Sequence, residues 1–188
     1  MAQPKTRPAT YADILALPPH IVGEILFGVL HTHPRPAPRH GRASSMLGVE
    51  LGNPFDRRHD GPGGWVFIDE PELHLGEHVI VPDIAAWRRE RLPALPETAW
   101  FETPPDWVCE VLSPSTQSVD RTDKLAVYAS FGVGHAWYVD PIARTLEVLV
   151  RQKDGKWLIA ATFKDADPVS APPFEVHTFP LDVLWSIS

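Results

Sequence analysis

Two acidic residues, each alone inside an apolar segment, constrain this chain more than any other feature of its sequence. Asp83 lies within the apolar segment 79–87, and Glu110 lies within Trp107–Leu112. We interpret both segments as strands, in which each acid would share a face with apolar neighbours. A buried carboxylate is costly unless a partner offsets its desolvation, and a divalent cation is such a partner. The pattern therefore predicts a metal site at Asp83 and Glu110.

Length and composition indicate a folded domain of ordinary size. The chain has 188 residues, of which 44% are hydrophobic, so a single domain over residues 1–188 can bury a proper core. It has no run of about 18 uncharged apolar residues, and we therefore expect no membrane span. The single cysteine, Cys109, excludes an internal disulfide and is typical of a cytoplasmic protein.

The charge balance limits how the chain could bind nucleic acid. The formal net charge is −7 at pH 7, whereas nonspecific binding to DNA or RNA depends on Lys and Arg that neutralise phosphates. Basic residues are dense only in the segment 35–42 and in Arg88–Arg91. Any nucleic-acid surface must therefore be local, and the acidic composition favours modest affinity or a small substrate.

Hydrophobic periodicity and turn residues predict the elements of the chain. Helices are expected over Tyr11–Leu17, over His40–Asn53, and over about 12 residues that begin near Ser118 and end before Gly132. Strands are expected over Glu24–His33, Trp65–Ile68, Leu73–Leu75, 79–87, Trp107–Leu112, His135–Asp140, Thr145–Arg151 and Lys156–Phe163, with a short one in the tail Pro172–Ser188. Turns are expected at Asp60–Gly64 and at Asp154-Gly155.

The order of these elements predicts the fold class. The strand–helix–strand unit within Trp107–Asp140 implies two parallel strands joined by a right-handed crossover. The hairpin around Asp154-Gly155 adds antiparallel neighbours. We therefore expect an α+β fold, with α/β-like features, in which helices flank a mixed central sheet. No internal repeat or second domain is evident.

The two acids and one lysine predict a hydrolytic site. If the two acid-bearing strands pair, about 4.8 Å apart, Asp83 and Glu110 can reach one cation, which could activate a water and polarise a phosphoryl oxygen. Such a site also needs a positive group, and Lys124 on the following helix is the best candidate. An ordinary surface ion pair with Asp120 is the alternative for this lysine. Tyr128 is expected in the core with its hydroxyl at the edge.

Several segments of this chain together resemble a known family. They are Pro82-Asp83, the segment Pro105–Thr116, the spacing Asp120-x-x-x-Lys124-x-x-x-Tyr128, and Phe131–Pro141. In this combination the chain resembles the Uma-two family, a large bacterial family described as putative restriction endonucleases, within the PD-(D/E)XK nuclease superfamily. The resemblance covers most of the chain and is densest from Val79 to Val150.

The resemblance implies a restriction-endonuclease-like core that binds Mg²⁺, with Mn²⁺ as a substitute. By position, Asp83 matches the motif aspartate and Glu110 the motif acid on the next strand. The superfamily's usual lysine would stand at Leu112, whereas the Uma-two pattern takes its lysine from the next helix, which matches Lys124. Glu24 matches a glutamate near the first strand that could complete the metal shell, with an exposed strand-end charge as the alternative.

Other site chemistries have weaker support in the sequence. His40 matches a family histidine that could touch a substrate phosphate, and together with His31 and His33 it could also suggest a transition-metal site. No cysteine or acid stands at tight ligand spacing to these histidines. Ser113 and Ser115 lack a motif with a base, and we expect them to shape the turn after the strand.

Our main hypothesis is a metal-dependent endonuclease that hydrolyses phosphodiester bonds of DNA. The alternative is a catalytically inactive nuclease fold that serves as a binding or oligomerisation module, in which the acids pair with lysine and bind no metal. The apolar tail and the Asp154-Gly155 hairpin could supply a homodimer interface, which would suit an enzyme that cuts both strands.

Overall fold

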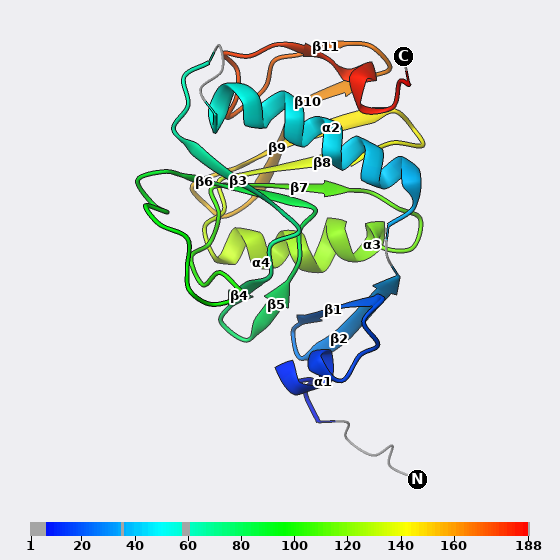
Figure 1. Cartoon of the computed structure of the whole chain (residues 1–188), viewed down its shortest axis with the longest axis vertical. Helices are drawn as coiled ribbons and strands as arrows, with labels where there is room; N and C mark the ends of the chain where they lie inside the picture. Colours follow the sequence, from blue (N-terminus) through cyan, green and yellow to red (C-terminus); the bar gives the residue numbers. More distant parts are fainter. Residues whose placement is uncertain (1–6, 35, 58–60, 188) are drawn as a thin grey trace.

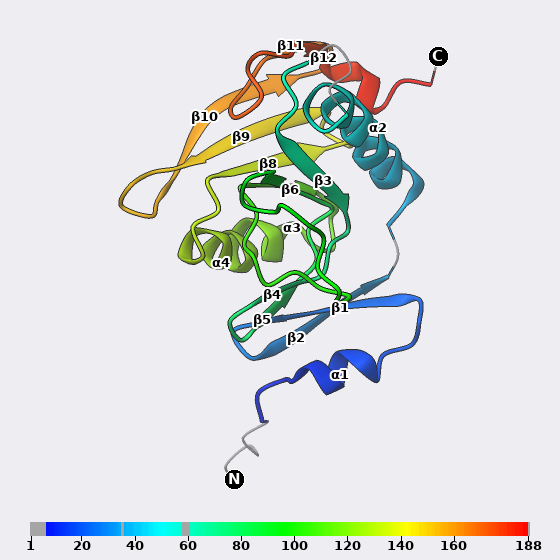
Figure 2. The ribbon, with the colours of Figure 1, turned by 60° about the vertical axis from the view of Figure 1, so that its left-hand side comes forward.

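The computed structural model describes residues 7–34, 36–57 and 61–187, and they form two main sheets and several helices (Figures 1 and 2). Arg35 of the expected basic segment and Asp60 of the expected turn lie outside the described residues. No helix in the described ranges is long and apolar enough to cross a bilayer. In chain order the elements are α1 (Tyr11–Leu15), β1 (Ile21–Leu26), β2 (Val29–Pro34), α2 (Pro38–Phe55), β3 (Trp65–Asp69), β4 (Leu73–Leu75), β5 (His78–Ile80), β6 (Ile84–Arg88), β7 (Trp107–Val111), α3 (Gln117–Val119), η1 (Asp120–Lys124), α4 (Leu125–Ser130), β8 (His135–Asp140), β9 (Thr145–Arg151), β10 (Trp157–Lys164), β11 (Pro168–Val169), β12 (Phe179–Pro180) and η2 (Leu181–Leu184).

The larger sheet is the mixed central sheet that the element order predicts. Its strand order is β10-β9-β8-β7-β6-β3, and only the β7–β8 pair is parallel. Helix α2 covers one face, and the helical segment α3–η1–α4 covers the other (Figure 1). This segment connects the two parallel strands, so the predicted strand–helix–strand unit is confirmed. The fold class is therefore α+β with a mixed sheet between helices.

Helix α2 and the tail bury one face of this sheet. Leu47, Leu51 and Phe55 recur at helical spacing and are buried against aromatic residues of the sheet. Alternation along β7 sends Trp107 and Cys109 into the same cluster. Glu110 points to the opposite face, where α4 packs, and the face predicted for this acid is correct. The core of the sheet thus fixes the direction of the Glu110 side chain.

The expected single strand over Glu24–His33 is instead a hairpin. Strands β1 and β2 pair in antiparallel fashion with Leu26 opposite Val29. The two residues between them, Phe27 and Gly28, have φ angles of 52° and 75°. Two successive residues with positive φ make the tight turn that matches the twist of a hairpin, and Gly28 adopts this conformation without strain. The chain therefore reverses direction at Phe27 and Gly28.

The expected continuous strand over residues 79–87 is also wrong. It divides into β5, which pairs with β1 and β4 in the smaller sheet, and β6, which pairs with β7 in the larger one. Pro82 lies at the division, where its missing N–H prevents a continuous hydrogen-bonded ladder. Asp83 therefore lies in a bend between two sheets and does not alternate with apolar residues on a strand face.

The helix after Glu110 contains an irregular turn. Its residues Gln117–Ser130 run continuously through α3, η1 and α4, and η1 has the wider hydrogen bonding of a π-helix. Such a turn adds a residue and rotates the later turns of the helix, and it is frequent at functional sites. The buried residues are Asp120, Lys124, Val127 and Tyr128, whereas Leu125 and Ala129 are half-buried.

Candidate active site

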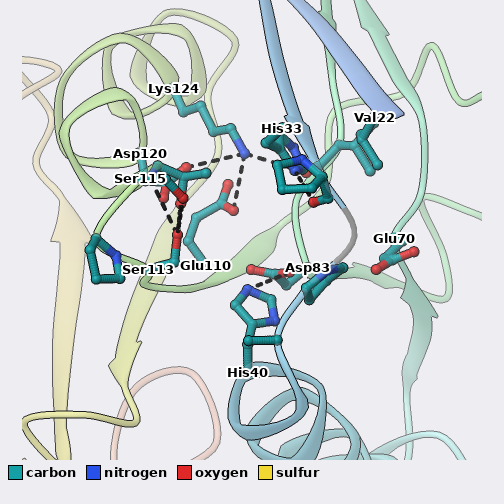
Figure 3. Close-up of a pocket in the computed structure, with 16 residues that line it drawn as sticks. Val22, His33, His40, Glu70, Asp83, Glu110, Ser113, Ser115, Asp120 and Lys124 are labelled. Carbon is teal, nitrogen blue, oxygen red and sulfur yellow. Dashed lines mark hydrogen bonds and ion pairs between the residues drawn. The ribbon is translucent and has the colours of Figure 1, made fainter. Parts of the chain in front are cut away.

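The predicted catalytic residues line one cavity between the two sheets. The cavity has a volume of about 270 Å³, and its walls include Asp83, Glu110, Lys124 and His40. Figure 3 shows these side chains converging from the β5–β6 bend, the end of β7, the helical segment, and the start of α2. Strands β6 and β7 are direct neighbours, with Ile84 opposite Cys109. This pairing brings Asp83 and Glu110 to the same cavity, as the sequence predicted.

Glu110 is buried and held by two donors from the helical segment. Its side chain is 3% exposed. The Tyr128 hydroxyl donates a hydrogen bond of 2.6 Å to Oε1, and Lys124 Nζ lies 3.2 Å from Oε2. Tyr128 was expected to pack in the core with its hydroxyl at the edge, but this hydroxyl binds the predicted motif acid. Both oxygens of Glu110 are thus oriented by residues one helical turn apart.

Lys124 lies within a group of three carboxylates. Its ammonium is 3.0 Å from Glu24, 3.2 Å from Glu110 and 3.3 Å from Asp120, and the lysine side chain is only 4% exposed. The ion pair with Asp120 exists, but the alternative of an exposed surface pair is wrong because both residues are buried. Sequence reasoning did not place Asp120 in the site; its i, i+4 spacing to Lys124 was the available signal.

Asp83 has different partners from those of Glu110. Its Oδ2 accepts a hydrogen bond of 2.7 Å from the Val111 amide, and its Oδ1 lies 3.2 Å from His40 Nε2. The Asp83 contact with His40 fixes the first turn of α2 against the β5–β6 bend (Figure 3). His40 therefore lines the cavity and contacts Asp83.

Glu24 supports the site from the smaller sheet. Strand β1 buries this side chain, whose Oε1 accepts a hydrogen bond of 2.7 Å from the Val81 amide and also contacts Lys124. The alternative of an exposed strand-end charge is therefore wrong. His33 lies 3.8 Å from the second oxygen of Glu24. Glu24 thus links β1, the β5–β6 bend and the helical segment.

The buried charges perturb one another strongly. Burial raises the pKa of Glu110 well above its usual range, although the nearby Lys124 ammonium opposes this shift. Burial raises the pKa of Asp120 in the same way. Burial alone would lower the pKa of Lys124, but the surrounding carboxylates, first Glu110, raise it well above its usual range. Lys124 therefore stays charged, and the excess of carboxylates over cations makes the cavity strongly attractive to a proton or a metal ion.

Burial alone would lower the pKa of His40, but the hydrogen bond and the charge of Asp83 raise it above its usual value. An imidazole in this position carries positive charge more readily than a free histidine. His40 can therefore present a cation at the wall of the cavity.

The donor set of the cavity fits a hard divalent cation. Asp83 and Glu110 offer carboxylate oxygens; Lys124 pairs with Glu24, Glu110 and Asp120, while Asp83 contacts His40. Within the described ranges, no group of three or more His, Cys, Asp or Glu is arranged as a ready metal cage. Mg²⁺ does not require one, because it usually keeps several waters and binds through one or two carboxylates.

The other sequence candidates make local contacts. His33 and His40 contact different acids, Glu24 and Asp83. Ser113 hydrogen-bonds Ser115 and Thr116 at 3.0 Å and so shapes the turn that leads into α3.

The arginines of Arg88–Arg91 are occupied by structural contacts. Arg88 stacks over Trp65 at 4.0 Å, while Arg89 pairs with Asp56 at 2.8 Å and Arg91 with Asp106. This part of the expected basic surface therefore stabilises the fold.

Comparison with known proteins identifies the family. The model of the Uma2 family, described as "putative restriction endonuclease", matches residues 11–183. A crystal structure of a putative nuclease belonging to DUF820 from Anabaena variabilis ATCC 29413 has a similar fold, with a TM-score of 0.71 and 22% sequence identity; the similarity covers 95% of this chain and 98% of that chain. The search of curated proteins gave no match. Because the family match covers nearly the whole chain, the protein belongs to the Uma2 family of putative restriction endonucleases.

Proposed function

We propose that this protein is a Mg²⁺-dependent endonuclease that hydrolyses phosphodiester bonds of DNA. One observation carries the proposal: Asp83, directly before β6, and Glu110, on the neighbouring strand β7, open onto the same cavity as the buried Lys124. A nuclease site requires hard oxygen ligands beside a positive group, and Asp83, Glu110 and Lys124 supply both. Membership of the Uma2 family supports the same conclusion.

Each side chain has a distinct role in the proposed reaction. Asp83 and Glu110 would hold the Mg²⁺, for which Mn²⁺ could substitute, and the bound ion would activate a water and polarise the phosphoryl oxygen. Lys124 would orient that water or stabilise negative charge on the phosphate, while Tyr128 keeps Glu110 in position. His40, which also lines this cavity, would contact a phosphate oxygen.

Glu24 is an auxiliary residue in this proposal. Its contacts with Lys124 and the Val81 amide set the position of the ammonium. We propose that Glu24 acts by holding Lys124 and that the metal is held by Asp83 and Glu110.

We further propose that the protein is a single-domain cytoplasmic homodimer, since a two-fold dimer suits cleavage of both DNA strands. Strand β10 supports the dimer, because it lies at the edge of the larger sheet and exposes Leu158 and Ile159. The buried Cys109 thiol is compatible with a reducing compartment.

A second candidate function is a catalytically inactive binding module. The observation that favours it is the set of ion pairs around Lys124, which already gives Glu24, Glu110 and Asp120 a cationic partner. In that case the acids would stabilise the fold and would bind no metal.

Cleavage of supercoiled plasmid tests the proposal. Wild-type protein should nick the plasmid with Mg²⁺ or Mn²⁺ and not with EDTA, and Asp83→Ala and Lys124→Ala should each lower the rate by at least about a hundredfold. Lys156→Ala, on the exposed β9–β10 hairpin, is the matched control for Lys124→Ala and should retain full activity. Circular dichroism should confirm that each variant is folded. Absence of nicking by folded wild-type protein with either metal would favour the binding module.

A further inference from the structure

The N-terminal turn of α2 contributes to a second cavity beside the active site. We call it the arginine pocket; its volume is about 410 Å³ and its walls include Arg39, Arg42, Arg144, Ile142 and Trp185. Arg39 and Arg42 lie one turn apart on α2, whereas Arg144 comes from the turn between β8 and β9. Three positive charges from two separate elements therefore meet at one place on a chain whose net charge is −7.

These arginines differ from those of Arg88–Arg91. All three are exposed, and among the described residues none forms an ion pair with an acid. Arg42 donates a hydrogen bond of 2.8 Å to the carbonyl of Ser186, which holds the C-terminal segment beside α2 in both views (Figures 1 and 2). Like charges gathered without acids repel one another, so an anionic ligand would relieve this repulsion.

A third cavity lies between the arginine pocket and the active-site cavity and adjoins both. An intermediate apolar cavity of about 420 Å³ shares His40, Ser113 and Pro114 with the active-site cavity. The same cavity shares Arg39 and Ile142 with the arginine pocket. A polyanion with one phosphate at the acid pair could therefore extend past His40 and reach the arginines.

We infer that the arginine pocket binds the phosphate backbone of DNA next to the bond that is cut. This inference rests on the proposed nuclease function, because it takes the acid cavity as the place of the scissile phosphate. Guanidinium groups suit the task, since they stay charged and bind phosphate oxygens in a bidentate manner. The arginine pocket also explains how an acidic protein could bind DNA, namely through a local surface.

The salt dependence of DNA binding tests the inference directly. Binding of a fluorescein-labelled DNA duplex to the full chain should be followed by anisotropy in EDTA across a KCl series. Each phosphate contact contributes about 0.9 to the slope of log K against log [salt], so the double variant Arg39→Gln/Arg144→Gln should lower the slope by about 1.8 and weaken binding at least about tenfold at low salt. Lys153→Gln/Lys156→Gln removes the same charge from the exposed hairpin and should leave the slope unchanged.

The two proposals fail in different ways. If the arginine variant binds duplex with the same slope and affinity as the lysine variant, or if wild-type protein binds no DNA, the arginine pocket is not a DNA-binding surface. If the arginine variant alone loses binding while wild-type protein never nicks plasmid with Mg²⁺ or Mn²⁺, the arginine pocket binds DNA, but the nuclease function fails and so does the placement of the pocket beside a cleaved bond. Metal-dependent nicking that is equal in both double variants supports the nuclease function and overturns the inference.

Discussion

At the scale of single residues, the site contains two buried tyrosine hydroxyls that allow a matched comparison. Tyr128 donates to the Glu110 carboxylate at 2.6 Å, and Tyr138 donates to the backbone carbonyl of Asp120 at 2.7 Å. Both side chains are almost completely buried. Only the Tyr128 hydroxyl orients an acid that we propose as a metal ligand. Substitution of each tyrosine in turn therefore distinguishes an effect on the metal site from an effect on the stability of the fold.

Tyr128→Phe should therefore lower both stability and metal affinity. Loss of a hydrogen bond to a charged group costs about 1.5–3 kcal/mol of unfolding free energy, and a neutral one costs about 1 kcal/mol. Urea unfolding should show a lower unfolding free energy for Tyr128→Phe and for Tyr138→Phe. Titration with Mn²⁺ should show weakened binding only for Tyr128→Phe. Equal metal affinity in Tyr128→Phe and Tyr138→Phe would show that the Tyr128 hydroxyl has no influence on the ligand.

At the scale of elements, Glu24 connects the β1–β2 hairpin to the rest of the site. Its Oε1 accepts the Val81 amide and contacts Lys124, so strand β1, the β5–β6 bend and η1 meet at one carboxylate. A buried amide without an acceptor and a buried lysine with one partner fewer are both costly. The position of this hairpin is therefore coupled to the position of Lys124, the lysine that we propose is catalytic.

Substitutions of Glu24 should separate the effect of its hydrogen bond with the Val81 amide from the effect of its ion pair with Lys124. Glu24→Gln keeps an oxygen that can accept from Val81 and should be less destabilising than Glu24→Ala, for which we expect a loss of about 3–5 kcal/mol. If Glu24 acts only through Lys124, Glu24→Gln should lower the nicking rate while the Mn²⁺ affinity stays within about threefold of wild type. A large loss of Mn²⁺ affinity in Glu24→Gln would instead make Glu24 a metal ligand.

Local patterns predicted the elements that surround the site better than they predicted its centre. The apolar run around Glu110 and the periodicity of α2 show which side chains each element buries. Strand β7 and helix α2 could therefore be predicted from their own sequences. The place of Asp83 depends on which sheet each half of the segment 79–87 joins, and that choice is made by tertiary pairing with β1 and β7. The proline was the available signal, since it prevents a continuous ladder.

The position of Lys124 has a similar explanation. Residue identity and the family resemblance pointed to this lysine. Lys124 lies four residues after Asp120 and four before Tyr128, so the three side chains share one face of the helix. A charged pair at this spacing is normally exposed, and its burial here depends on Glu24 and Glu110, which tertiary pairing brings to the same place.

At the scale of the whole molecule, the cavity concentrates negative charge inside an already acidic protein. Three carboxylates surround Lys124, Asp83 lies on the same cavity beside His40, and the formal net charge of the chain is −7. Folding brings these acids together against their mutual repulsion, and a bound divalent cation would relieve that cost. Metal binding and global stability should therefore be linked.

Divalent metal should consequently raise the melting temperature of the wild-type protein. A ligand at a hundred times its Kd stabilises the folded state by about 2.7 kcal/mol, which corresponds to about 5–10 °C for a chain of this size. Differential scanning calorimetry with Mg²⁺ or Mn²⁺ should show this shift, and Asp83→Asn should abolish it. Asp154→Asn removes the same charge from the exposed β9–β10 hairpin and should keep the full shift. An equal shift in both variants would place the stabilising ion outside the cavity, and no shift in wild-type protein would mean that Lys124 alone balances the buried acids.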